Sequence, residues 1–145
     1  MAGVDDVSIR AARADDVAAV LAVWAIARSS AASTPDSDTA IEGLLARDPD
    51  ALLVAEVEGT VVGVLIAAFD GWRGSLYRLA VLPPFRRRGV AAALVRHGEE
   101  RLRSLGCPKV TALVGVAERD ALVFWETVGY ARDRDVGRLV RVLPA

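Results

Sequence analysis

The sequence predicts a single α/β domain built around a sheet that is covered on both faces. Its 145 residues suit one domain with a substantial core. The apolar segments Ala51–Val57 and Thr60–Phe69 are joined at Glu58-Gly59, which predicts a β-hairpin. A long helix over Gly89–Leu105 precedes a near-continuous apolar strand over Lys109–Val116. Such an apolar run is typical of a strand with both sheet faces covered.

The elements before the hairpin follow from periodicity and from breaking residues. Val7–Ala11 is predicted to be a short first strand. The apolar residues of Val17–Arg28 recur at helical spacing, so this segment is predicted to be a helix. Ser29–Asp38, rich in Ser, Asp and Pro, is predicted to be a loop, and Thr39–Arg47 a second helix that ends before Pro49.

The elements after the hairpin are predicted in the same way. A turn over Asp70–Gly74 leads into a third strand of the meander, Ser75–Leu82. After the apolar strand, a helix over Arg119–Val128 is stopped by Gly129. A last strand is expected over Leu139–Leu143.

Composition and charge exclude several classes of function. The formal net charge of −1 creates no global field that would recruit nucleic acid or an acidic membrane. The chain has one histidine and one cysteine, too few ligands for a metal site, and Cys107 alone forms no intrachain disulfide. Met1–Asp6 does not resemble a signal peptide, and no apolar run is long enough to span a membrane. We therefore expect a cytoplasmic protein.

The segment Leu79–Ala92 carries most of the functional information. An apolar strand ends at Pro83-Pro84, three arginines follow, and Gly89 opens an alanine-rich helix. A helix start offers unpaired backbone N–H groups and the positive end of the helix dipole, which together favour an anion. The segment therefore predicts a site for a pyrophosphate. The alternative is a solvated basic turn before an ordinary helix.

Two motifs resemble those of a known family. Arg86-x-x-Gly89-x-Ala91, after the strand Leu76–Leu82, resembles the Arg/Gln-x-x-Gly-x-Gly/Ala signature of the GNAT superfamily of acyl-CoA N-acyltransferases. Ala121-x-x-Phe124-Trp125-x-x-x-Gly129-Tyr130 is similar to a second conserved segment of that family. The resemblance implies a GNAT-like mixed, mainly antiparallel sheet of six to seven strands. It also implies a V-shaped splay between strands four and five, with helices on both faces.

The resemblance implies acetyl-CoA as co-substrate and no metal. The pantetheine arm would lie in the splay and pair with the backbone of the strand, while the helix start would bind the pyrophosphate. The cofactor-binding residues expected on this basis are Leu79, Ala80, Val81, Arg86, Arg87, Arg88, Gly89, Val90, Ala91 and Ala92.

The expected catalytic residues are Glu118, Trp125 and Tyr77, and here the sequence departs from the family. Trp125 stands where many members have a tyrosine that is the proposed acid, and an indole N–H cannot deliver a proton. Leu113 stands where some members have a glutamate base. Glu118 is then the best base candidate, with Asp70 and Tyr77 behind it. The alternatives are an acid favoured by the helix dipole for Glu118 and core packing for Tyr77 and Trp125.

The predicted activity is the transfer of an acetyl group from acetyl-CoA to a primary amine of a small molecule or peptide. The departures at Trp125 and Leu113 leave a non-catalytic acyl-CoA-binding module as the alternative. The acceptor pocket would come from the loops Ser29–Asp38 and Asp70–Gly74, which do not specify a ligand. No nucleic acid or membrane partner is expected, and a homodimer is left open.

Overall fold

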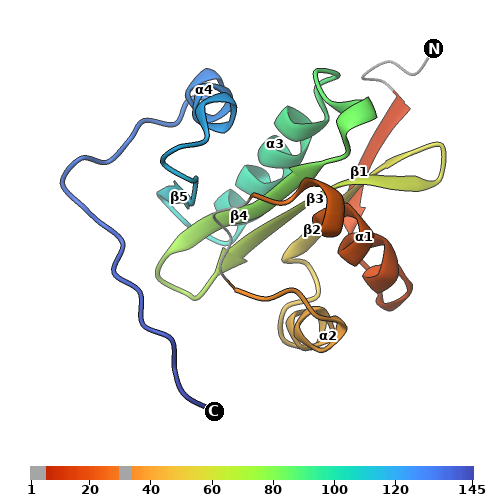
Figure 1. Ribbon diagram of the computed structural model, residues 1–145, viewed down its shortest axis with the longest axis horizontal. Helices are drawn as coiled ribbons and strands as arrows, with labels where there is room; N and C mark the ends of the chain where they lie inside the picture. Colours follow the sequence, from red (N-terminus) through yellow and green to blue (C-terminus); the bar gives the residue numbers. More distant parts are fainter. Residues whose placement is uncertain (1–5, 30–33) are drawn as a thin grey trace.

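The structure is a computed structural model that describes residues 6–29 and 34–145 of the chain. Within these residues, five strands form one sheet in the order β1-β2-β3-β4-β5. Figure 1 shows helices on both sides of this sheet. The elements are β1 (Val7–Ala11), α1 (Val17–Ala27), α2 (Asp38–Arg47), β2 (Leu52–Val57), β3 (Thr60–Phe69), β4 (Gly74–Val81), α3 (Val90–Ser104), β5 (Val110–Ala112) and α4 (Arg119–Thr127).

The first four strands pair antiparallel, and β5 pairs parallel with β4. The β2–β3 turn is formed by Glu58 and Gly59, which both have positive φ angles (52° and 78°). Two such residues are typical of a type I′ turn, whose twist matches that of the flanking strands. The predicted hairpin is confirmed, and β3 has the predicted boundaries. β1 also has the predicted boundaries, and among the other predicted helices and strands only those at Lys109–Val116 and Leu139–Leu143 depart from the prediction by more than one residue.

The helices cover the two faces of the sheet. On one face α1 packs through Val20, Val23 and Trp24 against β2, β3 and β4, and α2 joins the same layer. On the other face α3 packs through Leu94, and α4 reaches the same core through Trp125. The prediction of a mainly antiparallel sheet with helices on both faces is therefore confirmed.

The strand predicted over Lys109–Val116 is much shorter than expected. Only Val110–Ala112 is extended and paired, and Leu113 and Val116 are 49% and 78% exposed. The prediction took an apolar run as a sign of burial on both faces. Pairing with β4 ends at Ala112, however, and the following residues form a loop that leads to α4.

The strand predicted over Leu139–Leu143 is not formed, so the expected six to seven strands become five in the described residues. Residues 131–145 are exposed and have no regular secondary structure, and Figure 1 shows them running from α4 away from the sheet. A strand needs a neighbouring edge whose backbone groups it can pair with. One edge of the sheet, β5, is only three residues long, and residues 131–145 pair with no described strand.

Candidate functional site

The parallel strands β4 and β5 separate soon after they meet. They pair only between Gly74–Leu76 and Val110–Ala112, and a last backbone bond joins Leu113 N to Leu76 O at 3.3 Å. From Tyr77 to Val81, no described strand pairs with the β5 side of β4. Pairing between strands four and five thus ends at Leu76 and Ala112, and the predicted splay would lie beyond this point.

A β-bulge lies at the point where the strands separate. Val64 pairs with Ala80 and Ile66 with Tyr77, so β4 holds an additional residue opposite β3. Arg78 occupies the bulge with a φ of 58°, a left-handed conformation that costs a non-glycine residue about 1–3 kcal/mol. The indole Nε1 of Trp24 donates to the Arg78 carbonyl at 3.1 Å and thereby holds this conformation.

The bulge precedes Leu79, Ala80 and Val81, the residues whose backbone is predicted to pair with a pantetheine arm. The side chains of Ala80 and Val81 are buried and that of Leu79 is half-buried, so they fill the core. Beyond the bulge, the edge that faces β5 lacks a strand partner among the described residues. An amide-bearing chain can pair with such an edge as an added strand would.

The arginine-rich segment forms a turn before α3. Arg87 and Gly89 both have left-handed backbone conformations (φ 62° and 81°). The first helical bond runs from Ala93 N to the Gly89 carbonyl at 3.0 Å. The N–H groups of Val90, Ala91 and Ala92 therefore have no carbonyl partner within the helix. They lie at the positive end of the helix dipole. Backbone N–H groups in such a turn form a concave anion site.

The three arginines of this turn have different environments. Arg86 donates from Nε to the Val81 carbonyl at 3.0 Å, which ties the turn to the end of β4. The guanidinium of Arg88 lies 5.6 Å from the centre of the Phe85 ring. All three arginines are exposed, so their remaining N–H groups can reach an anion at the helix start.

Glu118 precedes α4 at the far side of the splay. Its side chain does not cap the helix; its Oε1 instead accepts a hydrogen bond from Ser29 Oγ at 2.7 Å. Glu118 is half-buried, and Ser29 follows the C-terminus of α1. The contact therefore joins the end of α1 to the loop after β5, across the end of the splay.

The other proposed catalytic side chains are built into the core. Trp125 is 6% exposed and packs edge-to-face against Tyr130, with ring centres 4.9 Å apart. Tyr77 is half-buried against the α1 layer, and this burial raises the pKa of its hydroxyl. Tyr77 therefore stays protonated at neutral pH, which suits a donor better than a base. The burial of Trp125 and Tyr77 agrees with the alternative that both side chains serve core packing.

Asp70 serves the turn between β3 and β4. Its Oδ1 accepts the backbone N–H groups of Arg73 and Trp72, each at 2.7 Å. These bonds, led by that from Arg73, lower the pKa of the Asp70 carboxyl. A carboxylate with a lowered pKa and two donors is a weak base. The presence of Asp70 is thus explained by its hydrogen bonds within the turn.

A group of side chains at the bulge was missed by the sequence analysis. It consists of Trp24, Arg28, Asp36 and Arg78, hereafter the arginine cluster. Asp36 forms ion pairs with both Arg78 and Arg28, the latter at 3.0 Å. The Arg78 guanidinium lies 5.4 Å from the centre of the Trp24 ring. An arginine inside an apolar strand was the available signal, but its partners are far away in the sequence.

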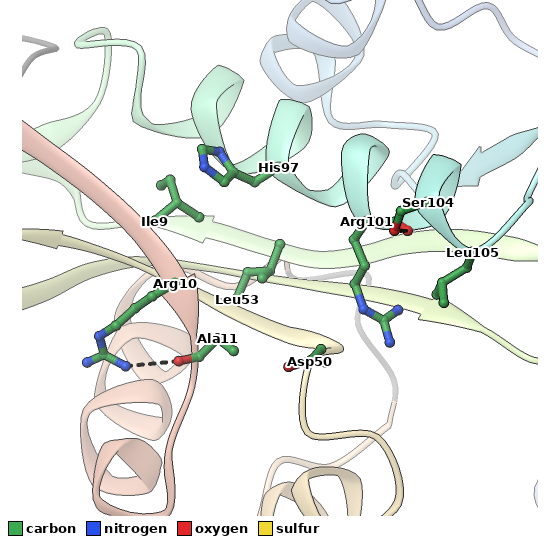
Figure 2. Close-up of a pocket in the computed structure, with 9 residues that line it drawn as sticks. All are labelled: Ile9, Arg10, Ala11, Asp50, Leu53, His97, Arg101, Ser104 and Leu105. Carbon is green, nitrogen blue, oxygen red and sulfur yellow. Dashed lines mark hydrogen bonds between the residues drawn. The ribbon is translucent and has the colours of Figure 1, made fainter.

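A pocket of about 380 Å³ lies apart from this site. Figure 2 shows it between α3, which contributes His97 and Arg101, and β1, which contributes Arg10. Both arginines already have carboxylate partners, Asp16 and Asp48. None of the residues expected to bind a cofactor lines this pocket. Across residues 6–29 and 34–145, no group of three or more metal-ligating side chains is found.

No helix in the described part of the chain has the length and apolar character needed to cross a bilayer.

Comparisons with known proteins agree with this geometry. The sequence model of the acetyltransferase (GNAT) family matches residues 18–130. The chain is 41% identical over 116 residues to an acetyltransferase of Photorhabdus laumondii, and the match covers 80% of each chain. Among solved structures it is similar to Ard1 from Thermoplasma volcanium, with a TM-score of 0.75 and 22% identity over 87% of this chain and 83% of that one.

It is also similar to the NatC complex bound to Gag peptide and CoA, with a TM-score of 0.74 and 18% identity over 89% of this chain and 87% of that one. At these identities the two solved structures establish the fold alone. The family model and the sequence relative go further: this chain belongs to the GNAT family of acetyltransferases.

Proposed function

We propose that the chain transfers an acetyl group from acetyl-CoA to a primary amine of a small molecule or peptide. The observation that carries this proposal is the edge of β4 that has no strand partner among the described residues, beside the arginine-rich start of α3. Acetyl-CoA has both complementary parts, an amide-bearing pantetheine arm and a pyrophosphate. We further propose a cytoplasmic location, which suits a chain whose single cysteine forms no intrachain disulfide.

In this proposal the cofactor is held mainly by backbone groups. Leu79, Ala80 and Val81 would pair with the pantetheine amides, and the N–H groups from Arg87 to Ala92 would bind the pyrophosphate. The guanidinium groups of Arg86–Arg88 add charge-assisted bonds of about 1.5–3 kcal/mol each. Because this recognition uses mostly backbone groups, small residues at the helix start, a glycine and alanines, let the pyrophosphate approach the backbone.

The reaction needs a neutral amine. Its nitrogen attacks the thioester carbonyl carbon, the C–N bond forms, the C–S bond breaks, and the amine loses one proton while the thiolate leaves. Neutralising a lysine-like amine at pH 7 costs about 4.6 kcal/mol, and an α-amino group costs about 1 kcal/mol. Glu118 is the proposed proton acceptor, because it is the half-buried carboxylate at the end of the splay and Ser29 fixes its position.

The thiolate leaves without a strong side-chain acid in this mechanism. Trp125 cannot deliver a proton, and the Tyr130 hydroxyl donates to Glu99 Oε2 at 2.8 Å. Burial, and then this bond, raise the pKa of Tyr130 well above its usual range. A thiolate is already a tolerable leaving group near neutral pH. The missing acid therefore raises the activation free energy of the step by only about 2 kcal/mol.

The proposal is tested by thiol release from acetyl-CoA with and without a panel of amines, together with calorimetry of acetyl-CoA binding. Gly89→Glu should abolish binding, because the new carboxylate would occupy the pyrophosphate site. Gly106→Glu is the matched control: Gly106 has a similar positive φ of 84° but follows the other end of α3.

Each outcome of this experiment is decisive. Loss of affinity in Gly89→Glu alone, with amine-dependent thiol release by the wild type, supports acetyl transfer. Unchanged affinity in a folded Gly89→Glu variant would reject the pyrophosphate site. Tight binding without release to any amine would favour the non-catalytic binding module, an alternative that the buried position of Trp125 keeps open.

A further inference from the structure

The exposed apolar side chains of the described residues are concentrated in the C-terminal part of the chain. Of the eleven large apolar residues that are exposed there and elsewhere in the described residues, eight lie from Leu113 to Leu143. Four of these eight, with exposed fractions of 65–99%, stand within the short segment Arg138–Leu143. Single exposed apolar residues are ordinary on a protein surface, whereas a concentration of them points to an interaction site.

Residues 131–145, hereafter the tail, have the side-chain pattern of a sheet strand. In an extended conformation, Leu139 and Leu143 would lie on one face of the tail, and Val140 and Val142 on the other. Apolar residues on both faces are typical of a strand in a covered sheet. Yet all residues of the tail are exposed, and the tail pairs with no described strand. The segment therefore has the composition of a strand and lacks its partner.

The strand β5 offers a complementary edge. It pairs with β4 on one side, and its other side has no strand partner in the described part of the chain. Val110 and Ala112 of β5 pack against the same core cluster as α3 and Trp125. The backbone groups along such an edge form a template for another strand. A strand added there would extend the sheet beyond β5.

The charges of the two segments are also complementary. The side chains of the tail comprise four arginines and two aspartates, which gives a net charge of +2. Residues 118–127, which comprise Glu118 and α4, hold three acidic side chains and one arginine, which gives a net charge of −2. Opposite charges of this kind favour docking of the tail on the β5–α4 side of the molecule.

A second copy of the chain carries both complementary parts. The tail leaves α4 and runs away from its own sheet (Figure 1), so its apolar residues are presented outward. The eight residues between Tyr130 and Leu139 span up to about 26–29 Å when extended, enough to reach a neighbouring molecule. If each of two copies places its tail on the other, the same contact forms twice around a two-fold axis. The tail and residues 110–128 together offer more than the about 20–30 residues that a stable interface uses on each side.

We propose that the protein forms a symmetric dimer in which residues 138–143 of each copy pair, as an added strand, with the outer edge of β5 in the other copy. The inference goes beyond the proposed acetyl transfer and does not rest on it. The dimer uses the side of β5 that faces away from β4, whereas the proposed cofactor edge is the side of β4 that faces β5.

The first test measures the mass of the full chain by sedimentation over a range of concentrations. The mass should approach twice the 15.4 kDa of one chain as the concentration rises. Leu139→Pro/Val140→Pro should raise the dissociation constant of the dimer at least about tenfold. Neighbouring residues of a strand direct their N–H groups to opposite sides, so one of the two prolines removes a donor to β5 in either register. Val136→Pro/Gly137→Pro is the matched control, earlier in the same tail, and should leave the dissociation constant unchanged.

A second test separates exchange between copies from pairing within one chain. One variant carries Thr111→Cys on β5, Val142→Cys in the tail and Cys107→Ala, which removes the native thiol. A short bismaleimide should link two of these chains, so that the product has the mass of a dimer under denaturing conditions. Each single-cysteine variant in the same background is the control, because a link between the tail and β5 needs both cysteines.

Each alternative result would overturn the proposal. A chain that stays monomeric at every concentration would exclude the dimer. A dimer with the same dissociation constant in Leu139→Pro/Val140→Pro would show that another surface forms it. A link that stays within one chain would show that the tail pairs with its own β5. None of these results would bear on the proposed acetyl transfer, which is measured separately by thiol release.

Discussion

At the scale of single residues, Glu118 is the group whose replacement tests the chemistry most directly. We expect Glu118→Gln to lower the rate by about 10²–10⁴-fold, with little change in affinity for acetyl-CoA. The loss should be largest for amines of high pKa and should shrink as the assay pH rises, because solvent then supplies the neutral amine. Rates measured from pH 6 to pH 10 with two amines of different pKa check this.

The control for this prediction is Glu126→Gln, an exposed glutamate on α4 whose loss should not change the rate. A loss in Glu118→Gln that is independent of pH would mean that Glu118 binds or positions groups instead of accepting a proton.

Trp24 supports the bulge of β4 and should therefore affect cofactor binding from a distance. Trp24→Phe removes the hydrogen bond to the Arg78 carbonyl but keeps an aromatic ring beside the guanidinium. We expect a loss of about 1–2 kcal/mol in unfolding free energy and up to about tenfold weaker binding of acetyl-CoA. Trp72→Phe is the control, because Trp72 is 82% exposed. Equal effects in both variants would contradict the role of Trp24.

At the scale of elements, the contact between α3 and the sheet depends on a missing side chain. A Cβ at Gly98 would lie 2.9 Å from Leu76 Cδ2 and 3.2 Å from Leu65 Cδ2. Gly98→Ala should therefore destabilise the protein by about 1–3 kcal/mol, although alanine is the better helix former. Gly43→Ala, on α2 with no atom within 4 Å of the new Cβ, should stabilise it by about 0.5–1 kcal/mol.

Chemical denaturation of the two variants checks this opposition. If both changes stabilise the protein, α3 has room to move away from the sheet and the close contact at Gly98 does not limit packing.

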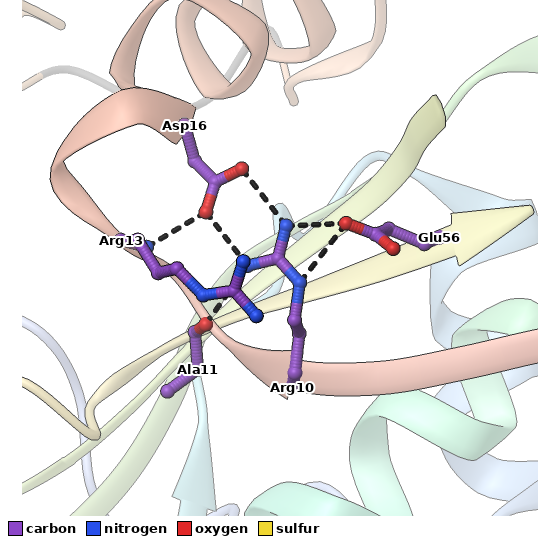
Figure 3. Close-up of polar contacts among 5 residues, drawn as sticks. All are labelled: Arg10, Ala11, Arg13, Asp16 and Glu56. Atoms are coloured by element: carbon purple, nitrogen blue, oxygen red, sulfur yellow. Dashed lines mark hydrogen bonds and ion pairs between the residues drawn. The ribbon is translucent and has the colours of Figure 1, made fainter. Parts of the chain in front are cut away.

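At the scale of the whole molecule, an ion-pair network joins β1, β2 and the turn before α1. Figure 3 shows Arg10 between Asp16 and Glu56, with the backbone N–H of Arg13 also bound to Asp16. The bond from Arg10 lowers the pKa of the Asp16 carboxyl. A lowered pKa in the folded state means that Asp16 stabilises the protein above its unfolded pKa of about 3.9, and that this stabilisation is lost as the pH falls further.

We therefore expect Asp16→Asn to cost about 2–4 kcal/mol of unfolding free energy at pH 7 and to flatten the decline of stability below pH 4. Asp15→Asn, at the exposed neighbouring residue, should remain within about 0.5 kcal/mol of the wild type. Denaturation curves between pH 2 and pH 7 measure both effects. An acid profile of Asp16→Asn that parallels the wild type would place the acid-sensitive group elsewhere.

Local sequence features were sufficient to predict much of the fold. The hairpin with β3 at Thr60–Phe69, the start of α3 after Gly89 and the end of α4 before Gly129 all follow from periodicity and from glycines at positive φ. The arginine-rich turn was predictable for the same reason, because an anion site at a helix start is built from neighbouring residues.

Tertiary structure decided the strand ends and the long-range polar contacts. Each of these depends on a partner that the local sequence does not identify. The strand predicted to extend to Val116 ends at Ala112, where its pairing with β4 stops, and Leu139–Leu143 pairs with no described strand. Arg78 meets Asp36 across 42 positions of sequence, and Ser29 meets Glu118 across 89. The sequence by itself determined the family and the layers, whereas only folding brought together side chains such as Ser29 and Glu118 that are far apart along the chain.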